Sequence, residues 1–194
     1  MWEKVKRSTK PNDQRCMKHK WVFEIKKSGK FRSRLVACRH SQTGGVDFTQ
    51  VHSPVVNDVT FCIWLLFSMM RNLTPLVFNV NVAFLNGKLE EEMHMDCPKG
   101  LCHEKDECLL LKKTIYGLIQ SAQQHGLKFQ NMLVELGFKQ CPSDPCLFYR
   151  KNHLGPLMLV SHVDDNACAG DEAAIDDMLK GLNEHGLTYA RESP

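Results

Sequence analysis

The sequence predicts an α+β fold, and three observations carry this prediction. Strand-like segments come in pairs joined by short turns, which indicates antiparallel sheets. Helix-like segments with one apolar face are mixed with these pairs along the chain. Hydrophobic residues make up 43% of the 194 residues, enough for a core in one domain or in two small lobes.

The N-terminal part predicts a basic leader followed by a hairpin. Residues 1–20 are polar and basic without periodicity, so we expect a loosely ordered leader. Residues 21–25 (WVFEI) are typical of a strand, and residues 26–30, with Ser28-Gly29, form a turn. Residues 31–39 alternate in part and predict the return strand.

The middle of the chain predicts a helix and two further strands. Asn57 or Asp58 can cap a helix that runs through an apolar stretch to about Met70. Residues 76–80 (LVFNV) have the composition of a short buried strand, and residues 109–111 are another strand candidate.

The C-terminal part predicts two helices around a strand pair. One helix begins at Ser121 and ends before Gly137, a residue suited to the left-handed conformation that closes helices. Residues 146–150 and 157–163 predict two strands joined by a turn, and Asp171 can cap a last helix.

Charge is distributed unevenly along the chain. Residues 1–40 hold 13 lysines and arginines against 3 acidic residues, whereas the remainder holds 12 against 19. A basic lobe joined to an acidic body predicts that one part holds a polyanion and the other carries carboxylate chemistry. A solvated, lysine-rich leader is the simpler alternative.

Nine cysteines are scattered without a C-x-x-C pair, which favours reduced thiols in the cytoplasm or nucleus. No membrane span is expected, because the longest apolar stretch, 59–70, is shorter than the roughly 20 residues that a span needs. A zinc site is an alternative use of Cys97, Cys102, His103 and Cys108, but their spacing differs from that of structural zinc ligands.

The sharpest local motif is an aspartate pair, Asp164-Asp165, that follows the apolar run 157–160. Two adjacent carboxylates at the end of a buried strand are costly unless something neutralises them. Mg²⁺ does so well because it prefers hard oxygen ligands. A solvated turn that contains two aspartates is the alternative.

Short motifs in a fixed order resemble copia-type reverse transcriptases of the Pseudoviridae, LTR retrotransposons, over nearly the whole chain. The motifs are WVF at 21–23, RLVA at 34–37, VDF at 46–48, SPVV at 53–56, AFLNG at 83–87, LEEE at 89–92, KK at 112–113, YGL at 116–118, LGF at 136–138, DPCL at 144–147 and VDD at 163–165. Each motif is weak by itself, but their shared order and spacing is specific.

The resemblance implies a right-hand polymerase. Residues 21–190 would form a palm, an antiparallel sheet packed on helices, with a β-rich fingers subdomain and no thumb. The implied activity is that of an RNA-directed DNA polymerase, a nucleotidyltransferase that adds dNTPs to a primer 3′-hydroxyl with two Mg²⁺ ions. RNA or DNA primer–template would be the partner.

The resemblance also implies the catalytic residues. Asp164 and Asp165 would hold metal, and the third catalytic aspartate would stand where this chain has Asn79. Asparagine keeps the shape and one carbonyl oxygen but loses the charge, so metal affinity should fall. The rate should fall by orders of magnitude. We therefore expect an inactive enzyme.

Three residues would contact nucleotide on this resemblance. Arg34 matches a basic fingers residue, Phe84 an aromatic residue under the sugar, and Gln120 a glutamine after Tyr-Gly-Leu. An exposed arginine, a core phenylalanine and a plain polar residue are the simpler readings of the three.

Other departures from the family pattern suggest decay. His162 replaces a usual Tyr, Asn81 a usual Lys, Ser121-Ala122 a usual Ala-Pro, and His125-Gly126 a usual Trp-Tyr. Gly126 in a helix costs about 1 kcal/mol. Two alternatives to a polymerase remain, namely a non-catalytic nucleic-acid-binding module and an inert remnant of a retroelement.

Overall fold

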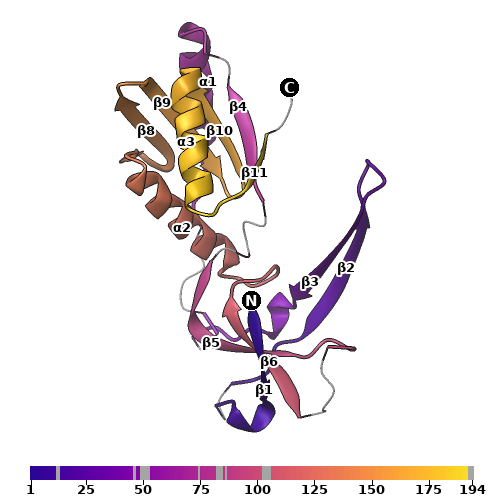
Figure 1. Cartoon of the computed structure of the whole chain (residues 1–194). Coiled ribbons are helices and arrows are strands. Elements are labelled where there is room, and N and C mark those ends of the chain that lie inside the picture. The colour runs from indigo at the N-terminus through magenta and orange to yellow at the C-terminus, as the bar shows by residue number, and fades with distance from the viewer. Residues whose placement is uncertain are drawn as a thin grey trace. The chain divides into compact units, whose positions relative to one another are not determined.

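The computed structural model describes residues 1–11, 14–45, 47–48, 53–73, 75–81, 85, 87–101 and 106–191. These residues form three α-helices and eleven strands in three antiparallel sheets, which confirms the α+β class (Figure 1). The chain divides into two compact units that are described separately. Unit 1 comprises Met1–His52 and Phe84–His125, and unit 2 comprises Ser53–Ala83 and Gly126–Pro194.

Unit 1 contains a three-stranded sheet in the order β1-β6-β5, formed by Trp2–Lys6, Glu107–Lys113 and Lys88–Asp96. Alternate residues of β5 and β6 face a core whose fully buried members include Met93, Met95 and Leu109. The opposite face carries the side chains that alternate with these along each strand.

The loose order predicted for residues 1–20 is wrong for much of this segment. Trp2–Lys6 pair with β6 as an edge strand, and Met17 is fully buried in the core beside Met95. Lys4 and Lys6, two of the lysines that made the segment look like a solvated leader, are charged side chains of the kind that edge strands commonly carry. The pairing partner lies about 100 positions later, where local sequence gives no hint of it.

A two-stranded hairpin, β2 (His19–Ile25) with β3 (Phe31–Ala37), extends from the rest of unit 1 as a long ribbon (Figure 1). Its base is fixed by the Tyr116-Gly117 turn, because the Ala37 amide donates to the Tyr116 carbonyl at 2.8 Å. Gly117 has φ +90°, and a Cβ there would overlap the Ala37 carbonyl oxygen. The Tyr-Gly-Leu motif therefore needs its glycine to seat the hairpin.

Unit 2 is built on a six-stranded sheet in the order β11-β4-β10-β9-β8-β7. The strands are β4 (Leu76–Val80), β7 (Lys139–Cys141), β8 (Asp144–Asn152), β9 (Gly155–His162), β10 (Asp165–Gly170) and β11 (Tyr189–Arg191). Consecutive strands β8, β9 and β10 form a meander, and β4 is inserted between β10 and β11.

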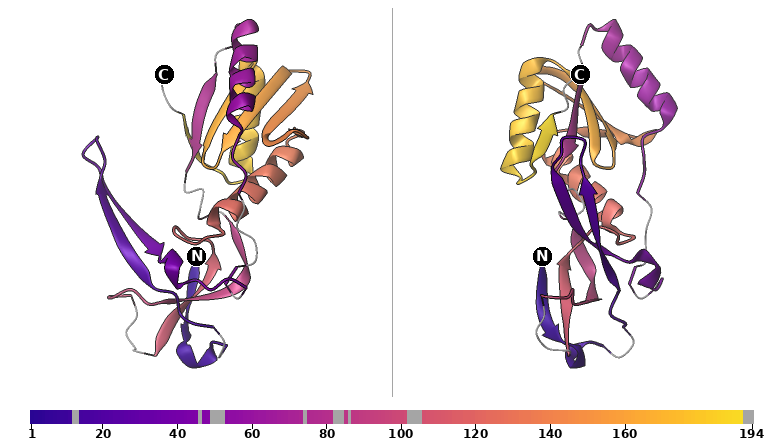
Figure 2. Two further views of the ribbon diagram at one scale, coloured as in Figure 1. Left: turned by 180° about the vertical axis from the view of Figure 1, so that it is seen from behind. Right: turned by 90° about the vertical axis from the view of Figure 1, so that its right-hand side faces the viewer.

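Helices cover the two faces of this sheet unequally. Residues of α2 (Ser121–Glu135) and α3 (Glu172–Glu184) share the main core of the unit with Phe78 and Leu159 on one face. On the other side of the sheet from α3 lies α1 (Asp58–Met70), which buries Trp64 against small residues of β10 (Figure 2).

The predicted helix starts are confirmed in position. Asn57 is the N-cap of α1, and its side-chain oxygen accepts from the Val59 amide at 2.9 Å. Asp171 stands at the N-cap of α3 but makes no capping hydrogen bond through its side chain. Gly137 follows α2 at φ +83°.

Candidate active site

The candidate site lies where β4 and β10 run side by side in unit 2. Asn79 and Asp165 are paired directly across these two strands. Phe78 and Val80, on either side of Asn79, are 0% and 2% exposed in the core. Because side chains alternate along a strand, Asn79 and Asp165 both point to the sheet face opposite that core.

Asn79 and Asp165 are joined by a short hydrogen bond. The Asn79 Nδ2 donates to Asp165 Oδ1 at 2.6 Å. Asp165 is exposed and Asn79 is half-buried, so this amide satisfies a carboxylate at the surface of the sheet. A carboxylate at position 79 would instead repel Asp165, since like charges directly across a strand pair are destabilising.

The turn between β9 and β10 fixes Asp164. Its carbonyl oxygen accepts from the Val80 amide at 2.9 Å and from Asn166 Nδ2 at 3.1 Å. The preceding residue, Val163, has φ +62°, a left-handed conformation that is strained for a β-branched side chain. The backbone around the aspartate pair is thus held by β4 and by the turn itself.

These side chains do not fit a pair of Mg²⁺ ions. Asp164 and Asp165 supply carboxylate oxygens, but the third position directs an amide nitrogen toward Asp165. Across the described ranges of the chain, no three histidine, cysteine, aspartate or glutamate side chains form a group that could hold a metal ion. Two-ion sites need enough carboxylate charge to hold both cations, and here that charge is incomplete.

Arg34 lies on the hairpin of unit 1 and is already engaged. Its Nη1 donates to Glu24 Oε2 at 2.9 Å, and its guanidinium carbon lies 5.5 Å from the centre of the Tyr116 ring. The Tyr116 contact links the arginine of RLVA to the tyrosine of Tyr-Gly-Leu, two motifs that are far apart in the sequence.

Gln120 is buried in unit 1, with 2% of its surface exposed. Its Nε2 donates to the Asp47 carbonyl at 2.9 Å, and its Oε1 accepts from Gln42 at 3.0 Å. These bonds give Gln120 a structural role, and a nucleotide contact there stays a prediction. Phe84, the third predicted nucleotide contact, lies outside the described residues.

The structure therefore brings Asn79 together with the aspartate pair, all in unit 2. The other described candidates, Arg34 and Gln120, belong to the other unit, unit 1. For the zinc alternative, Cys97 is disulfide-bonded, and Cys102 and His103 lie outside the described residues. The disulfide also departs from the expectation of reduced thiols.

Sequence reasoning missed the role of Asp144, which is 4% exposed. Burial raises its pKa, but hydrogen bonds from the Asn57 and Cys146 amides and from Thr60 outweigh this and hold the pKa below its usual value. The carboxylate thereby ties the start of α1 to β8. Its position in DPCL marked the resemblance without indicating this role.

Sequence comparison decides the family. A profile described as reverse transcriptase (RNA-dependent DNA polymerase) matches residues 1–188. This chain belongs to the reverse transcriptase family. The resemblance to copia-type enzymes is confirmed as well, because the relatives of this reverse-transcriptase chain are transposon polyproteins.

Two plant proteins illustrate the relationship. The Retrovirus-related Pol polyprotein from transposon TNT 1-94 of Nicotiana tabacum is 32% identical over 88% of this chain. The Retrovirus-related Pol polyprotein from transposon RE1 of Arabidopsis thaliana is 28% identical over 85% of it. The chain spans only 14% and 12% of the lengths of these polyproteins. In the described part of the chain, no helix is long and apolar enough to cross a membrane.

Proposed function

We propose that this chain is a reverse-transcriptase domain whose palm, unit 2, has lost catalytic competence through Asn79. Unit 1 would be the fingers. The ancestral reaction is templated addition of dNTPs to a primer 3′-hydroxyl, with Asp164 and Asp165 as the remaining catalytic residues. The observation that carries the proposal is the Asn79–Asp165 hydrogen bond, which occupies the third position with a neutral donor.

The physical reason for impairment is charge. Phosphoryl transfer of this kind relies on two divalent ions, one activating the attacking oxygen and one holding the leaving oxygen. A third carboxylate would help neutralise those ions, whereas an amide contributes at most a neutral carbonyl oxygen. To offer even that oxygen, Asn79 must rotate and give up its hydrogen bond to Asp165.

Primer extension tests this proposal. The chain, Asn79→Asp, and Asn79→Asp combined with Asp164→Asn are compared on a primed RNA template with Mg²⁺ or Mn²⁺. We expect extension by Asn79→Asp alone, at a rate orders of magnitude above that of the unchanged chain. Extension by the unchanged chain at the rate of Asn79→Asp would overturn the claim of impairment.

A measurement of metal binding separates a loss of metal affinity from poor binding of the primer. Mn²⁺ titration followed by electron paramagnetic resonance should show at least about tenfold tighter binding to Asn79→Asp than to the unchanged chain. Asn72→Asp is the matched control, because it adds the same charge at an exposed position before β4, whereas Asn79 lies near the end of that strand. Equal gains in both variants would show a nonspecific charge effect.

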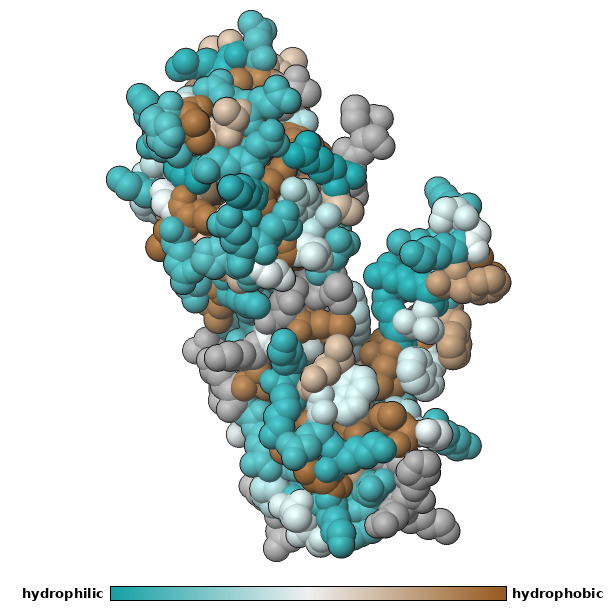
Figure 3. All heavy atoms as spheres, viewed as in Figure 1, coloured by the Kyte–Doolittle hydropathy of each residue, from teal (hydrophilic) through white to brown (hydrophobic). Residues whose placement is uncertain are grey.

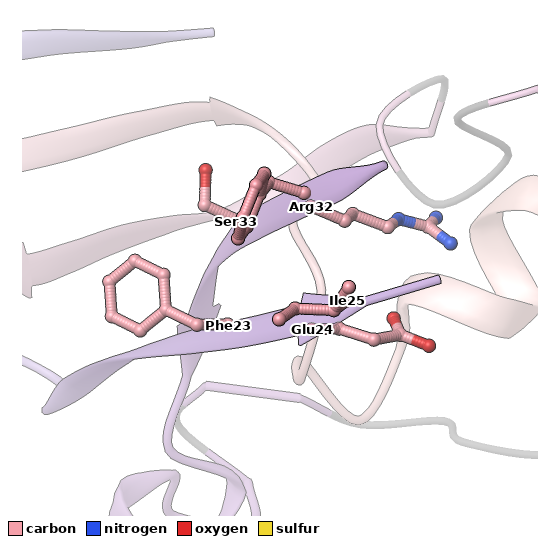
Figure 4. A pocket seen from close by; sticks show the side chains of 6 residues that line it. Phe23, Glu24, Ile25, Arg32 and Ser33 are labelled. Atoms are coloured by element: carbon pink, nitrogen blue, oxygen red, sulfur yellow. The ribbon is translucent and has the colours of Figure 1, made fainter. Parts of the chain in front are cut away.

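The hairpin of unit 1 favours a second candidate function, non-catalytic binding of single-stranded nucleic acid. One face of the hairpin carries exposed apolar side chains, with Phe23, Ile25 and Phe31 at 75%, 66% and 80% exposure. They border a hollow of about 390 Å³. Figure 4 shows that the side chains of Glu24 and Arg32 point away from the Phe23 ring.

The charge of the hairpin fits a polyanion. Residues 19–37 hold six lysines and arginines against one acidic residue, Glu24. Trp21 and Phe23 are stacked, with ring centroids 6.2 Å apart and 16° between the planes. Figure 3 shows apolar and hydrophilic residues next to one another on this ribbon. Aromatic rings on which bases stack, beside cations that attract phosphates, are the usual elements of single-strand binding.

Fluorescence anisotropy with a labelled single-stranded oligonucleotide tests this second candidate. Phe23→Ala with Phe31→Ala should weaken binding about tenfold or more, and added salt should weaken binding of the unchanged chain. Tyr149→Ala removes a less exposed aromatic side chain, 43% exposed, from β8 in unit 2 and should leave affinity unchanged. Equal losses in the two variants would contradict a role for the hairpin face.

A further inference from the structure

The helix α1 of unit 2 turns an apolar face to solvent. Its buried residues are Trp64 and Ser68, and Figure 2 shows α1 as the outermost described element of unit 2 on its side of the sheet. None of residues 59–70 carries a charge. Eight large apolar side chains of the helix are more than a third exposed, namely Val59, Phe61, Ile63, Leu65, Leu66, Phe67, Met69 and Met70.

The exposed apolar area of α1 has the size of a protein interface. At roughly 150–200 Å² for a whole large side chain, these eight side chains present on the order of 700 Å² to solvent. The largest apolar patch on a typical monomer is about 300–600 Å², whereas each partner in a standard protein interface contributes about 800 Å². A face of this size therefore indicates a protein partner.

The spacing of the most exposed side chains indicates that the partner is a helix. Val59, Ile63, Leu66 and Met70 follow one another at intervals of four, three and four residues, and each is at least 59% exposed. With 3.6 residues per turn, these four side chains form one stripe on the side of the helix opposite the buried Trp64. Such a stripe is the seam along which two helices pack side by side.

The charges that flank this stripe favour a second copy of α1 in the antiparallel direction. Asp58 begins the helix and Arg71 follows its last residue, and both are exposed. In an antiparallel pair centred between residues 64 and 65, each Asp58 lies opposite the partner copy's Arg71. The same alignment places Val59 opposite the partner copy's Met70, and Ile63 opposite the partner copy's Leu66. Charge and apolar stripe therefore agree on one alignment.

The geometry points to an interaction surface: we propose that α1 packs antiparallel against α1 of a second copy of this chain, about a two-fold axis. Such a contact is self-complementary, so one surface serves both copies, and the dipoles of antiparallel helices attract each other. The proposal is independent of the proposed function, because it concerns neither the aspartate pair nor the hairpin face.

A hollow beside the stripe provides room for a side chain of the second copy. Its volume is about 250 Å³, and its walls include Ile63 and Phe67 of α1 and Leu147 and Met158 of the neighbouring strands β8 and β9. Apolar side chains that fill such hollows contribute much of the binding energy of protein interfaces.

Sedimentation of the unaltered chain tests the proposal. The measurement is made over a wide range of concentrations with a reducing agent, because Cys62 of α1 is an exposed thiol that could link copies covalently. We expect a reversible equilibrium between monomer and dimer, with a dissociation constant in the micromolar range, the weak end for an interface of this size. A chain that stays monomeric at the highest concentration, or that associates without stopping at the dimer, would overturn the proposal.

A pair of matched variants locates the contact. Leu66→Glu places a charge in the middle of the apolar stripe and should weaken dimerisation by about tenfold or more. Val134→Glu is the control, since Val134 is an apolar residue of nearly the same exposure on α2, and this variant should dimerise like the unaltered chain. Equal dimerisation of the two variants would show that α1 is not the interface.

Charge reversal tests the antiparallel direction. Asp58→Lys and Arg71→Asp each place like charges opposite one another in a pair of identical copies, so each variant alone should dimerise several-fold more weakly than the unaltered chain. An equimolar mixture of the two variants should recover dimers, because both contacts between unlike copies are then attractive. This recovery cannot come from a variant that folds poorly, and a mixture as weak as its two components would overturn the antiparallel arrangement.

Discussion

The strand β4 of unit 2 and the hairpin of unit 1 differ in where their aromatic side chains lie. In unit 2, Phe78 on β4 is fully buried and meets Tyr189 edge-on at 6.1 Å. In unit 1, Phe23 and Phe31 on the hairpin are mostly exposed. The candidate active site therefore stands on strands whose core-side face is packed, whereas the hairpin depends mainly on cross-strand pairing. Substitutions in the first should affect stability or chemistry, and those in the second should affect binding.

The largest expected effect separates two phenylalanines. Phe78→Ala should lower the free energy of unfolding by about 3–5 kcal/mol, because it removes a large side chain from a closed core. Phe23→Ala should change it by less than about 0.5 kcal/mol, because its ring is exposed. Urea unfolding of both variants measures the difference, and similar losses would break the comparison between the units.

A smaller effect is expected at Asp144, whose pKa lies below its usual value in the folded protein. Asp144→Asn should cost about 1–3 kcal/mol near pH 7, because hydrogen bonds to a buried charge are lost. The carboxylate stabilises the fold above the unfolded pKa of about 4, and this contribution is lost as pH falls through the lower folded pKa.

Unfolding measured between pH 7 and pH 2.5 checks this sign. The gap between the unchanged chain and Asp144→Asn should narrow below about pH 4. Asp171→Asn is the matched control, since Asp171 makes no side-chain capping bond at α3. A gap that stays constant over the acid range would contradict the assignment.

Asn79→Asp sharpens the comparison within unit 2. Without divalent ions it should lower stability by about 1–2 kcal/mol, because it replaces a hydrogen bond by repulsion across β4 and β10. Mg²⁺ or Mn²⁺ should restore the loss, because cations bind the recreated carboxylate cluster. Thermal melts of both chains with and without the ions provide the measurement, and a variant insensitive to divalent ions would argue against a metal site.

The smallest expected effect is on the hairpin. Glu24→Gln removes the exposed ion pair with Arg34 and should change the free energy of unfolding by less than about 0.5 kcal/mol. It should nevertheless strengthen oligonucleotide binding slightly at low salt, because the acidic residue of the hairpin is gone. Denaturant unfolding tests the stability prediction, and fluorescence anisotropy on the same samples tests the binding prediction. A large loss of stability would show that this exposed ion pair matters more to the fold than its exposure indicates.

The sequence predicted those elements whose signals are local. Asn57 caps α1, β4 has the predicted bounds, and the apolar face of α3 enters the core as its periodicity indicated. Caps and periodicity act within a few residues, so one sequence is enough to detect them.

Elements that depend on distant partners were not predicted. The strand β10 (DNACAG) has little strand propensity, yet it is held between β4 and β9. β1 likewise becomes a strand only beside β6. The division into two units was also hidden, since each unit is assembled from two separate stretches of the chain.

The candidate site shows the same limit. Asp164 and Asp165 stood out as a motif, and Asn79 as a departure from a family pattern, but only the register of β4 on β10 places Asn79 opposite Asp165. Gln120 looked available for a ligand because nothing local reveals that Asp47 and Gln42 enclose its amide.

The Asn79–Asp165 bond also bears on heredity. Asparagine and aspartate codons differ by a single base at their first position, so one transition exchanges the amide for a carboxylate. The strands that would receive this carboxylate are already in register, and the amide has kept them so by removing the repulsion between two acids. In a gene that carries such a change, the fold could outlast the loss of chemistry for many generations, and a single back mutation would recreate the third acid.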